Sequence, residues 1–294
     1  MGSKTKIDWC DATWNPVTGC LHGCEYCYAR RIAERFRGCI LDIVGDSVVV
    51  RDGCGKGPIY ELNNPVSKVD GIDPVLGSRV SKAPYPFSFS PTFHRYRLDI
   101  PARWTKPRTI FVCSMADLFG EWVPDEWIEL VFKACEAAPQ HRYLFLTKNP
   151  GRLAKMANAH NVRQWNERHP DKLHPNTDEY VGIPYLPRHD NWWFGSSLDN
   201  ADARRFDGGF HWNTFTSIEP LMEHMQMGIG SFGSDRWTII GAETGKRKNK
   251  VTPERAWIDN ILEAAAFTGM KVFMKESLRE LMGADFRQEF PWEE

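Results

Sequence analysis

The chain has 294 residues, of which 42% are hydrophobic and 26% are charged, and its formal net charge is −1. These values are typical of a globular domain, and they exclude recruitment of nucleic acid or membrane by net charge alone. No apolar run reaches the roughly 18 residues of a membrane-spanning helix. Eight cysteines without a secretory signal predict a cytoplasmic protein with reduced thiols.

Strand-like and helix-like apolar patterns alternate along most of the chain. The first predicted strand covers 12–17, and a helix with an apolar stripe follows over 29–36 and stops at Gly38. Further strands are predicted at 109–114, 142–147, 192–197, 212–217, 237–241 and 271–274, and further helices at 124–138, 150–159, 201–206 and 252–269. Such alternation predicts a parallel sheet with right-handed crossovers. The predicted fold class is therefore α/β, a partial (β/α) TIM-like barrel of six to seven parallel strands, with a doubly wound open sheet as the alternative.

Three cysteines lie between the first predicted strand and the first predicted helix. Cys20, Cys24 and Cys27 have C-x3-C-x2-C spacing, which places the last two at a helix entrance, where the helix dipole favours thiolates. Three thiolates suit a cubane iron–sulfur cluster with one iron left open. This spacing, with Tyr26 just before the third cysteine, resembles the signature of the radical S-adenosylmethionine enzymes. The resemblance implies a [4Fe–4S] cluster whose open iron binds S-adenosylmethionine before reductive cleavage.

The same cysteines allow other interpretations. A structural zinc site would take its fourth ligand from His22, Cys10, Cys39 or Cys54, and inert buried thiols are a further alternative. The length of the chain and the missing secretory signal disfavour a disulfide framework. Cys39 and Cys54 are also candidates for a second metal site, although two stray cysteines are ordinarily plain thiols. Cys113 is more typical of a core residue than of a hydrogen-atom donor.

Two segments interrupt the regular pattern. Residues 39–107 contain one strand-like run at 48–50 and many turn signals, so they are predicted to be an insertion over the cluster face within one domain that covers 1–294. Residues 160–190 are polar and rich in proline, and they are predicted to be a surface excursion.

Polar residues follow each predicted strand, where barrel enzymes carry their chemistry. Carboxylates at these positions suit the hydroxyl and amino groups of a nucleoside, and lysines suit a carboxylate or another anion. Ser197, Asp199 and Thr252 can equally be helix caps. The predicted catalytic residues are Lys148, Glu219 and Lys275, and the predicted cofactor-binding residues are Tyr26, Ser114, Asp117, Ser196, Ser197, Glu219, Gly241 and Glu243.

Six segments together resemble, in the same order, an uncharacterised phage- and prokaryote-encoded family with a three-cysteine motif, related to the radical S-adenosylmethionine enzymes. These segments are Thr13–Cys20, Ser114–Phe119, Leu146–Pro150, Ser217–Leu221, Gly241–Gly245 and Phe273–Lys275. The resemblance implies a partial barrel of the radical S-adenosylmethionine type, a [4Fe–4S] cluster on Cys20, Cys24 and Cys27, and S-adenosylmethionine as cofactor. Many members have a longer spacer between the first two cysteines, and Lys-Gln-Trp-Gly where this chain has Lys275–Leu278.

Two basic runs bear on the substrate: 94–97 with Arg103, Lys106 and Arg108, and 246–250 after the sixth predicted strand. Basic loops beside aromatic residues bind nucleic acids whose bases stack, so a nucleotide or nucleic acid is the substrate hypothesis. A solvated charged loop is the ordinary alternative, and a peptide or small molecule stays open. The expected partner is a low-potential electron donor of the flavodoxin or ferredoxin type, and no membrane is expected. The alternative function is a non-catalytic nucleic-acid-binding protein that carries zinc or a cluster.

Overall fold

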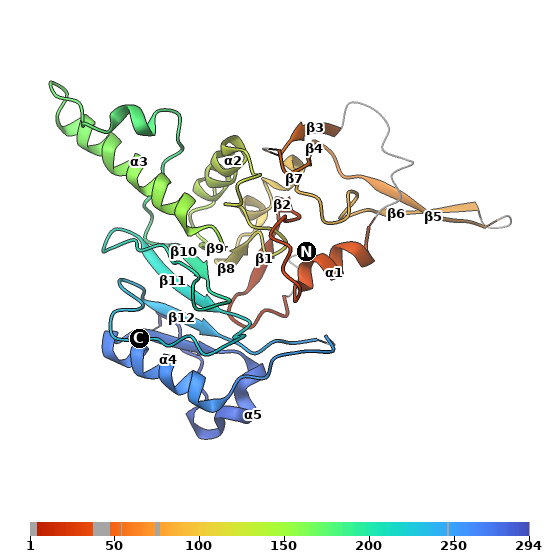
Figure 1. Ribbon diagram of the computed structural model, residues 1–294. Coiled ribbons are helices and arrows are strands. Elements are labelled where there is room, and N and C mark those ends of the chain that lie inside the picture. The colour runs from red at the N-terminus through yellow and green to blue at the C-terminus, as the bar shows by residue number, and fades with distance from the viewer. Residues whose placement is uncertain (1–4, 38–47, 54, 74–76, 246, 294) are drawn as a thin grey trace. The chain divides into compact units, whose positions relative to one another are not determined.

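The computed structural model of the chain describes residues 5–37, 48–53, 55–73, 77–245 and 247–293 (Figure 1). Cys39, Cys54 and Lys246, which the sequence marked as candidates, lie outside these residues. Seven parallel strands form one sheet in the order β1-β8-β9-β10-β11-β12-β13, which is the predicted α/β partial-barrel class. The chain divides into two compact units, one containing Cys10–His141 and the other containing Lys6–Trp9 and Arg142–Glu294.

In the first unit, the strand predicted over 12–17 is in fact two strands. β1 (Ala12–Trp14) pairs in parallel with β8 (Thr109–Val112), whereas β2 (Val17–Thr18) pairs antiparallel with β7 (Thr92–His94) in another sheet. Pro16 lacks the N–H that a continuous ladder needs, so the chain changes sheets here. The predicted first helix is α1 (Tyr28–Arg35), and the next is α2 (Asp125–Glu136).

Residues 39–107 contain more regular structure than their sequence predicts. Outside the part that is not described, β3 (Val48–Asp52), β4 (Pro58–Leu62), β7 and β2 form one sheet, and β5 (Ser67–Asp73) and β6 (Gly77–Lys82) form a two-stranded sheet. Glu61 shows why β4 was missed, because this charged residue is only 3% exposed and interrupts the apolar pattern. Its carboxylate is satisfied by Trp127 Nε1 and Arg95 Nε, each at 2.9 Å.

The second unit follows its predicted strands closely. They are β9 (Arg142–Thr147), β10 (Trp192–Ser197), β11 (Asn213–Ile218), β12 (Trp237–Ile240) and β13 (Lys271–Met274), paired in parallel in that order. α4 (Arg255–Thr268) ends at Gly269, whose φ of 67° is the left-handed conformation that glycine favours. Its buried face packs on one face of the sheet, where Ile258 and Ile261 meet Ile218, Ile240 and Val272.

Of the helices predicted in the second unit, one is longer than predicted and one does not form. α3 (Pro150–Arg168) continues nine residues beyond the predicted end, because neither proline nor glycine occurs between Gly151 and Pro170. No helix forms at 201–206. Asn200 Oδ1 accepts the Asp202 N–H at 3.0 Å there, a local bond that competes with the helical ladder.

The carboxyl-terminal part of this unit adds three short elements. η5 (Glu276–Leu278), α5 (Arg279–Met282) and η6 (Gly283–Asp285) follow β13 directly. Other short 3-10 turns are η2 (Arg95–Arg97), η3 (Pro101–Arg103) and η4 (Thr177–Tyr180). In the described part of the chain, no helix combines the length and the apolarity that crossing a membrane requires.

Candidate functional site

The three motif cysteines lie on the loop between β2 and α1. All three are free thiols, and each residue is partly exposed. Cys27 is the N-cap of α1, and its Sγ accepts the Arg30 N–H at 3.4 Å. Its sulfur therefore lies at the N-terminus of α1, where it takes the place of a capping acceptor.

Gly19 allows this loop to lie against its neighbours. Its φ is +85°, and a Cβ at this position would lie 2.2 Å from the Ser90 carbonyl oxygen, so only glycine fits. The Gly19 N–H donates to Met115 O at 2.9 Å and the Cys20 N–H donates to Phe89 O at 3.2 Å. The first cysteine is therefore held by its own N–H and by the N–H of the residue before it.

Cys20 differs electrostatically from an exposed thiol. Its pKa is raised to about 12, mainly by burial and to a smaller extent by the neighbouring Asp117, Cys24 and Cys27, while a hydrogen bond from the His22 backbone opposes the shift. Binding of a metal to such a thiol displaces its proton, so binding would be coupled to proton release.

The donor set fits an iron–sulfur cluster in its chemistry, because three free, partly exposed cysteines share one loop beside a helix N-terminus. Among the described residues, however, no three His, Cys, Asp or Glu side chains are already arranged as a metal site. A cluster would therefore be held by Cys20, Cys24 and Cys27 after their side chains turn toward it.

The segment after β8 is fastened to this loop and contains two predicted cofactor-binding residues, Ser114 and Asp117. Asn15 Oδ1 accepts the Met115 N–H at 2.9 Å and the Ser114 hydroxyl at 3.2 Å. The Tyr28 hydroxyl donates to Ser114 O at 2.7 Å. The predicted residue Tyr26 lies within the loop and is half-buried. The first unit thus brings Tyr26, Ser114 and Asp117 to the cysteine loop.

In the second unit, Lys275 and Glu219 meet at the carboxyl ends of β13 and β11. Lys275 Nζ pairs with Glu219 Oε1 and lies 4.0 Å from Asp8 Oδ1. Gly241, at the end of β12, leaves room for this pair, because a Cβ there would lie 3.0 Å from Lys275 Cδ and 3.2 Å from Glu219 Cγ. The structure therefore joins three of the predicted residues and adds Asp8.

Glu243 is 4% exposed and is paired with the basic loop after β12. Arg247 donates to both of its carboxylate oxygens at 2.7 Å, and the Val251 N–H donates at 3.2 Å. The hydrogen bonds from Arg247 lower the pKa of Glu243, which is therefore ionised at neutral pH. Lys248 and Lys250 of the same loop are exposed.

The remaining predicted residues of this unit lie near β9 and β10. Lys148 Nζ pairs with Asp199, so the amino group is already matched by a carboxylate. Ser196 is 1% exposed and its Oγ accepts the Phe206 N–H at 2.8 Å, which gives this side chain a structural role. Ser197, at the end of β10, is partly exposed. No helix begins after β10, so Ser197 and Asp199 are not the helix caps considered as an alternative.

The basic run at 94–97 is largely internal. Arg95 pairs with Glu61 and Glu126 at 2.8 and 2.9 Å. Arg97 donates to Asn15 O at 2.9 Å. His94 is fully buried, and burial lowers its pKa well below the usual value. These side chains connect β4, α2 and the β1–β2 link, so they do not form a free anion-binding surface.

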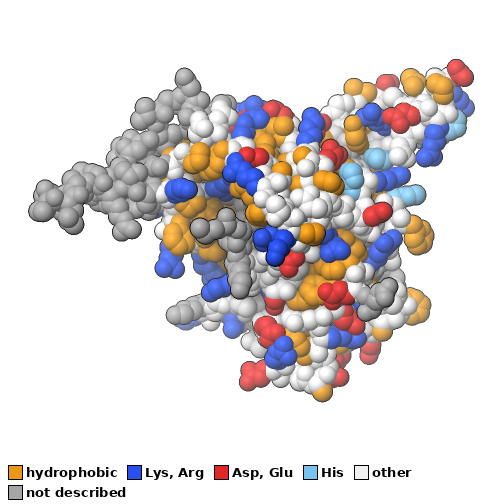
Figure 2. Space-filling view, turned by 180° about the vertical axis from the view of Figure 1, so that it is seen from behind, with side chains coloured by type: hydrophobic (Ala, Val, Ile, Leu, Met, Phe, Trp, Pro, Cys, Tyr) orange, Lys and Arg blue, Asp and Glu red, His pale blue; other side chains and the backbone are white. Residues whose placement is uncertain are grey.

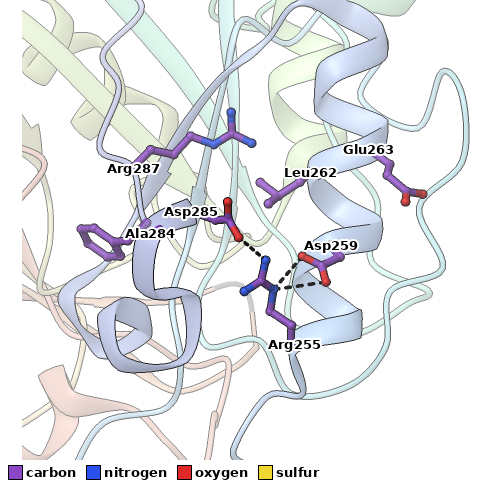
Figure 3. A pocket seen from close by; sticks show the side chains of 8 residues that line it. Arg255, Asp259, Leu262, Glu263, Ala284, Asp285 and Arg287 are labelled. Atoms are coloured by element: carbon purple, nitrogen blue, oxygen red, sulfur yellow. Dashed lines mark hydrogen bonds and ion pairs between the residues drawn. The ribbon is translucent and has the colours of Figure 1, made fainter.

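Two cavities lie away from the predicted site residues. One, of about 620 Å³, is lined by α4 and residues 284–287, where Arg255 lies between the carboxylates of Asp259 and Asp285 (Figure 3). The other, of about 420 Å³, is lined by α3, Thr177, Tyr180 and Val181. None of the predicted catalytic, cofactor-binding or metal-binding residues lines either cavity.

A family described as "Protein of unknown function (DUF5131)" matches residues 4–279, and therefore includes the cysteine loop and every predicted site residue. The chain belongs to this family. No curated protein matches the DUF5131 chain in sequence.

Two solved structures of spore photoproduct lyase are similar to this DUF5131 chain in fold. One is the enzyme complexed with a dinucleoside spore photoproduct, at 11% identity and a TM-score of 0.46. The other is a cysteine-to-alanine mutant with the dinucleoside spore photoproduct, at 10% identity and a TM-score of 0.45. Each comparison covers 94% of this chain and 79% of the other.

Sequence reasoning missed Asn15, Tyr28 and Asp8. Asn15 had a signal, because it precedes Pro16 directly before the cysteine motif, where the chain must leave the sheet. Tyr28 follows the last cysteine and reads as a helix residue, and Asp8 lies in a segment without apolar period. Tyr28 contacts Ser114, 86 positions away in the chain, and Asp8 contacts Glu276, 268 positions away. No local sequence pattern contains such contacts.

Proposed function

We propose that this DUF5131 protein is a radical S-adenosylmethionine enzyme whose Cys20, Cys24 and Cys27 hold a [4Fe–4S] cluster. The observation that carries the proposal is the loop itself: three free, partly exposed cysteines lie on one loop, and the Gly19 N–H attaches this loop to the segment directly after the parallel strand β8. The partial barrel places polar residues after its parallel strands, which is where such folds perform chemistry.

The bound cluster and S-adenosylmethionine would together supply reductive cleavage of the sulfonium and removal of a hydrogen atom from the substrate. The chain's own residues orient and shield that chemistry. Ser114 and Asp117 would border the cluster loop, with Tyr26 beside the adenine. Residues 39–107 would cover this face as an insertion, and the backbone contacts of Phe89 and Ser90 with Gly19 and Cys20 support that placement.

In the second unit, we assign nucleoside and anion binding to the strand-end residues. Glu219 and Glu243 would bind hydroxyl or amino groups, with Gly241 as the small residue between strands. Lys148 and Lys275 would bind a carboxylate or substrate anion after leaving their present carboxylate partners. Ser197 remains a candidate for nucleoside binding, and buried Ser196 would act by holding the Phe206 backbone.

A nucleotide or nucleic acid remains the proposed substrate class, and Lys248 and Lys250 are the exposed cations that support it. Replacing both lysines with Ala should weaken the binding of a single-stranded oligonucleotide at low salt. It should also reduce the salt dependence of the affinity, because each lysine that contacts a phosphate releases counterions on binding. The double variant Lys155→Ala/Lys172→Ala, which removes two exposed lysines outside both basic runs, is the matched control. Unchanged affinity and salt dependence in the Lys248→Ala/Lys250→Ala variant would count against this substrate class.

The cluster assignment is tested by anaerobic reconstitution followed by iron and sulfide analysis and electron paramagnetic resonance. Wild type should contain about four irons per chain and a reducible cubane signal. Cys24→Ala should lose most of this iron, whereas Cys135→Ala, which removes a fully buried thiol in α2, should retain it. A colourless wild type that binds one zinc would contradict the proposal and favour the non-catalytic zinc protein.

The proposed enzyme needs a low-potential electron donor, of the flavodoxin or ferredoxin class, and a reducing compartment that keeps its thiols free. We therefore propose a cytoplasmic location.

A further inference from the structure

His22 lies inside the cysteine loop, two residues after Cys20 and two before Cys24. Its Nε2 atom lies 2.7 Å from Asp117 Oδ2, a distance in the range of charge-assisted hydrogen bonds. Its ring packs edge-on against Trp122, with ring centroids 4.9 Å apart and an interplanar angle of 77°. A carboxylate and an aromatic ring therefore fix the orientation of this imidazole.

Asp117 has a second attachment that does not involve His22. The Asp117 side chain is 7% exposed, and its Oδ1 accepts the Phe119 N–H at 3.0 Å. A buried carboxylate is costly without hydrogen-bond donors, so the imidazole contact satisfies a group that the segment after β8 already holds in place. His22 is thereby tied to the same segment whose Met115 carbonyl holds Gly19.

We propose that His22 is a positioning residue that holds the backbone between Cys20 and Cys24 through its bond to Asp117. This inference rests on the proposed cluster function. Groups outside the ligand set orient the ligands of a metal site and set its affinity, and hydrogen bonds around the sulfurs set the reduction potential of a cluster. The middle of the loop is attached at His22, while Gly19 and the α1 N-cap hold its two ends.

The competing role for His22 is that of a metal ligand. Histidines that bind metals often donate their second ring N–H to a carboxylate, so the Asp117 contact alone is compatible with ligation through Nδ1. The proposed cluster takes its three protein ligands from Cys20, Cys24 and Cys27, and the His22 ring is already held by Asp117 and Trp122. The contacts that are present therefore favour positioning over ligation.

Two substitutions separate these roles. In His22→Gln, the amide nitrogen takes the place of Nε2 and donates to Asp117, but no atom replaces Nδ1. His22→Ala removes both nitrogens, and Asp117→Ala removes the acceptor. The exposed residue His224 supplies the control His224→Ala.

The first readout is the affinity for the cluster, measured as loss of iron to a chelator after anaerobic reconstitution, together with the potential of the cluster. If His22 is a positioning residue, His22→Ala and Asp117→Ala should retain iron about 10- to 100-fold more weakly than wild type. Any cluster that remains in these variants should have a shifted reduction potential. His22→Gln and His224→Ala should be close to wild type in both iron retention and potential. The variant that combines His22→Ala and Asp117→Ala should be no worse than Asp117→Ala alone, because Asp117→Ala already removes the bond to His22 together with the bond to Phe119. Equal losses in the Gln and Ala variants would overturn positioning and favour ligation, and wild-type retention in His22→Ala would overturn both roles.

The second readout needs no cluster. In the metal-free chain, His22→Ala should speed alkylation of Cys24 by iodoacetamide, because the loop loses its attachment, whereas His22→Gln should react at the wild-type rate. Equal alkylation rates in all three proteins would overturn the proposal. A wild type that assembles no cluster would instead contradict the proposed function, and the alkylation rates would still decide the role of His22.

Discussion

Asp235 is a buried carboxyl group that makes the stability of the second unit depend on pH. It is 5% exposed, it accepts a hydrogen bond from the Thr216 hydroxyl, and its Oδ1 lies 3.9 Å from Arg205 Nη1. Burial raises its pKa to about 6, and the hydrogen bond from Thr216 and the nearby guanidinium of Arg205 oppose this shift only in part. Because the pKa in the folded chain exceeds the unfolded value of about 3.9, the folded chain binds more protons between about pH 4 and 6.

Because the folded chain binds the extra proton at Asp235, the free energy of unfolding should fall as pH rises from about 4 to 6. The Asp235 carboxyl group should cause no further change above that range. Asp235→Asn keeps an oxygen for Thr216 but has no charge to bury. We expect the variant to lose this part of the pH dependence and to gain about 2–3 kcal/mol relative to wild type above pH 6. Urea denaturation at several pH values measures both quantities. A variant curve parallel to wild type from pH 4 to 7 would show that Asp235 titrates normally.

Single residues also show which side-chain roles can be predicted from a sequence. The cysteine motif, Glu219, Glu243 and Lys275 were predicted as site residues because spacing and strand ends mark them, and their roles stay predictions. Their partners were not found, because an ion pair such as Lys275 with Asp8 joins residues at opposite ends of the chain. The basic run at 94–97 shows the reverse error, since Arg95 is matched by buried Glu61 and by Glu126, which the run itself does not contain.

At the scale of elements, the cysteine loop depends on two glycines that the structure uses differently. Gly19 has φ +85° and would place a Cβ against the backbone of Ser90, whereas Gly23 has φ +75° and open space around it. Both positions cost an alanine about 1–2 kcal/mol in backbone strain. At Gly19 the displaced backbone adds a steric cost as well.

We therefore expect Gly19→Ala to lower the free energy of unfolding by roughly 3–5 kcal/mol and Gly23→Ala by about 1 kcal/mol. The two variants are matched, because they change the same residue type in the same loop with φ of the same sign. Denaturant unfolding followed by tryptophan fluorescence measures the difference. Equal destabilisation would mean that the contact between Gly19 and Ser90 relaxes at little cost.

Elements with strong local signals were predicted well, and the others failed for identifiable reasons. β9, β10 and β13 match their predicted bounds because apolar runs of strand length end in polar residues. The strands between 48 and 94 were mostly missed, because buried Glu61 and many turn residues hide their pattern. The absent helix at 201–206 shows that local hydrogen bonds of Asn and Asp outweigh a weak helical period.

At the scale of the whole molecule, the alternation of strands and helices was sufficient to predict the fold class, because parallel strands require crossovers and these repeat along the chain. The whole chain carries almost no net charge. The net charge is −1, and acidic and basic side chains are interspersed on the face drawn in Figure 2. Recognition of an anionic substrate must therefore come from local groups such as Lys248 and Lys250, as proposed above.

The central claim is that the cysteine loop supports reductive cleavage of S-adenosylmethionine. The most direct test is to incubate the anaerobically reconstituted protein with dithionite and S-adenosylmethionine and to quantify 5'-deoxyadenosine and methionine by mass spectrometry. We predict that both products form in equal amounts with wild type and Cys135→Ala, and that neither forms with Cys24→Ala. A wild-type protein that carries its cluster, binds S-adenosylmethionine and leaves it intact under these conditions would contradict the claim.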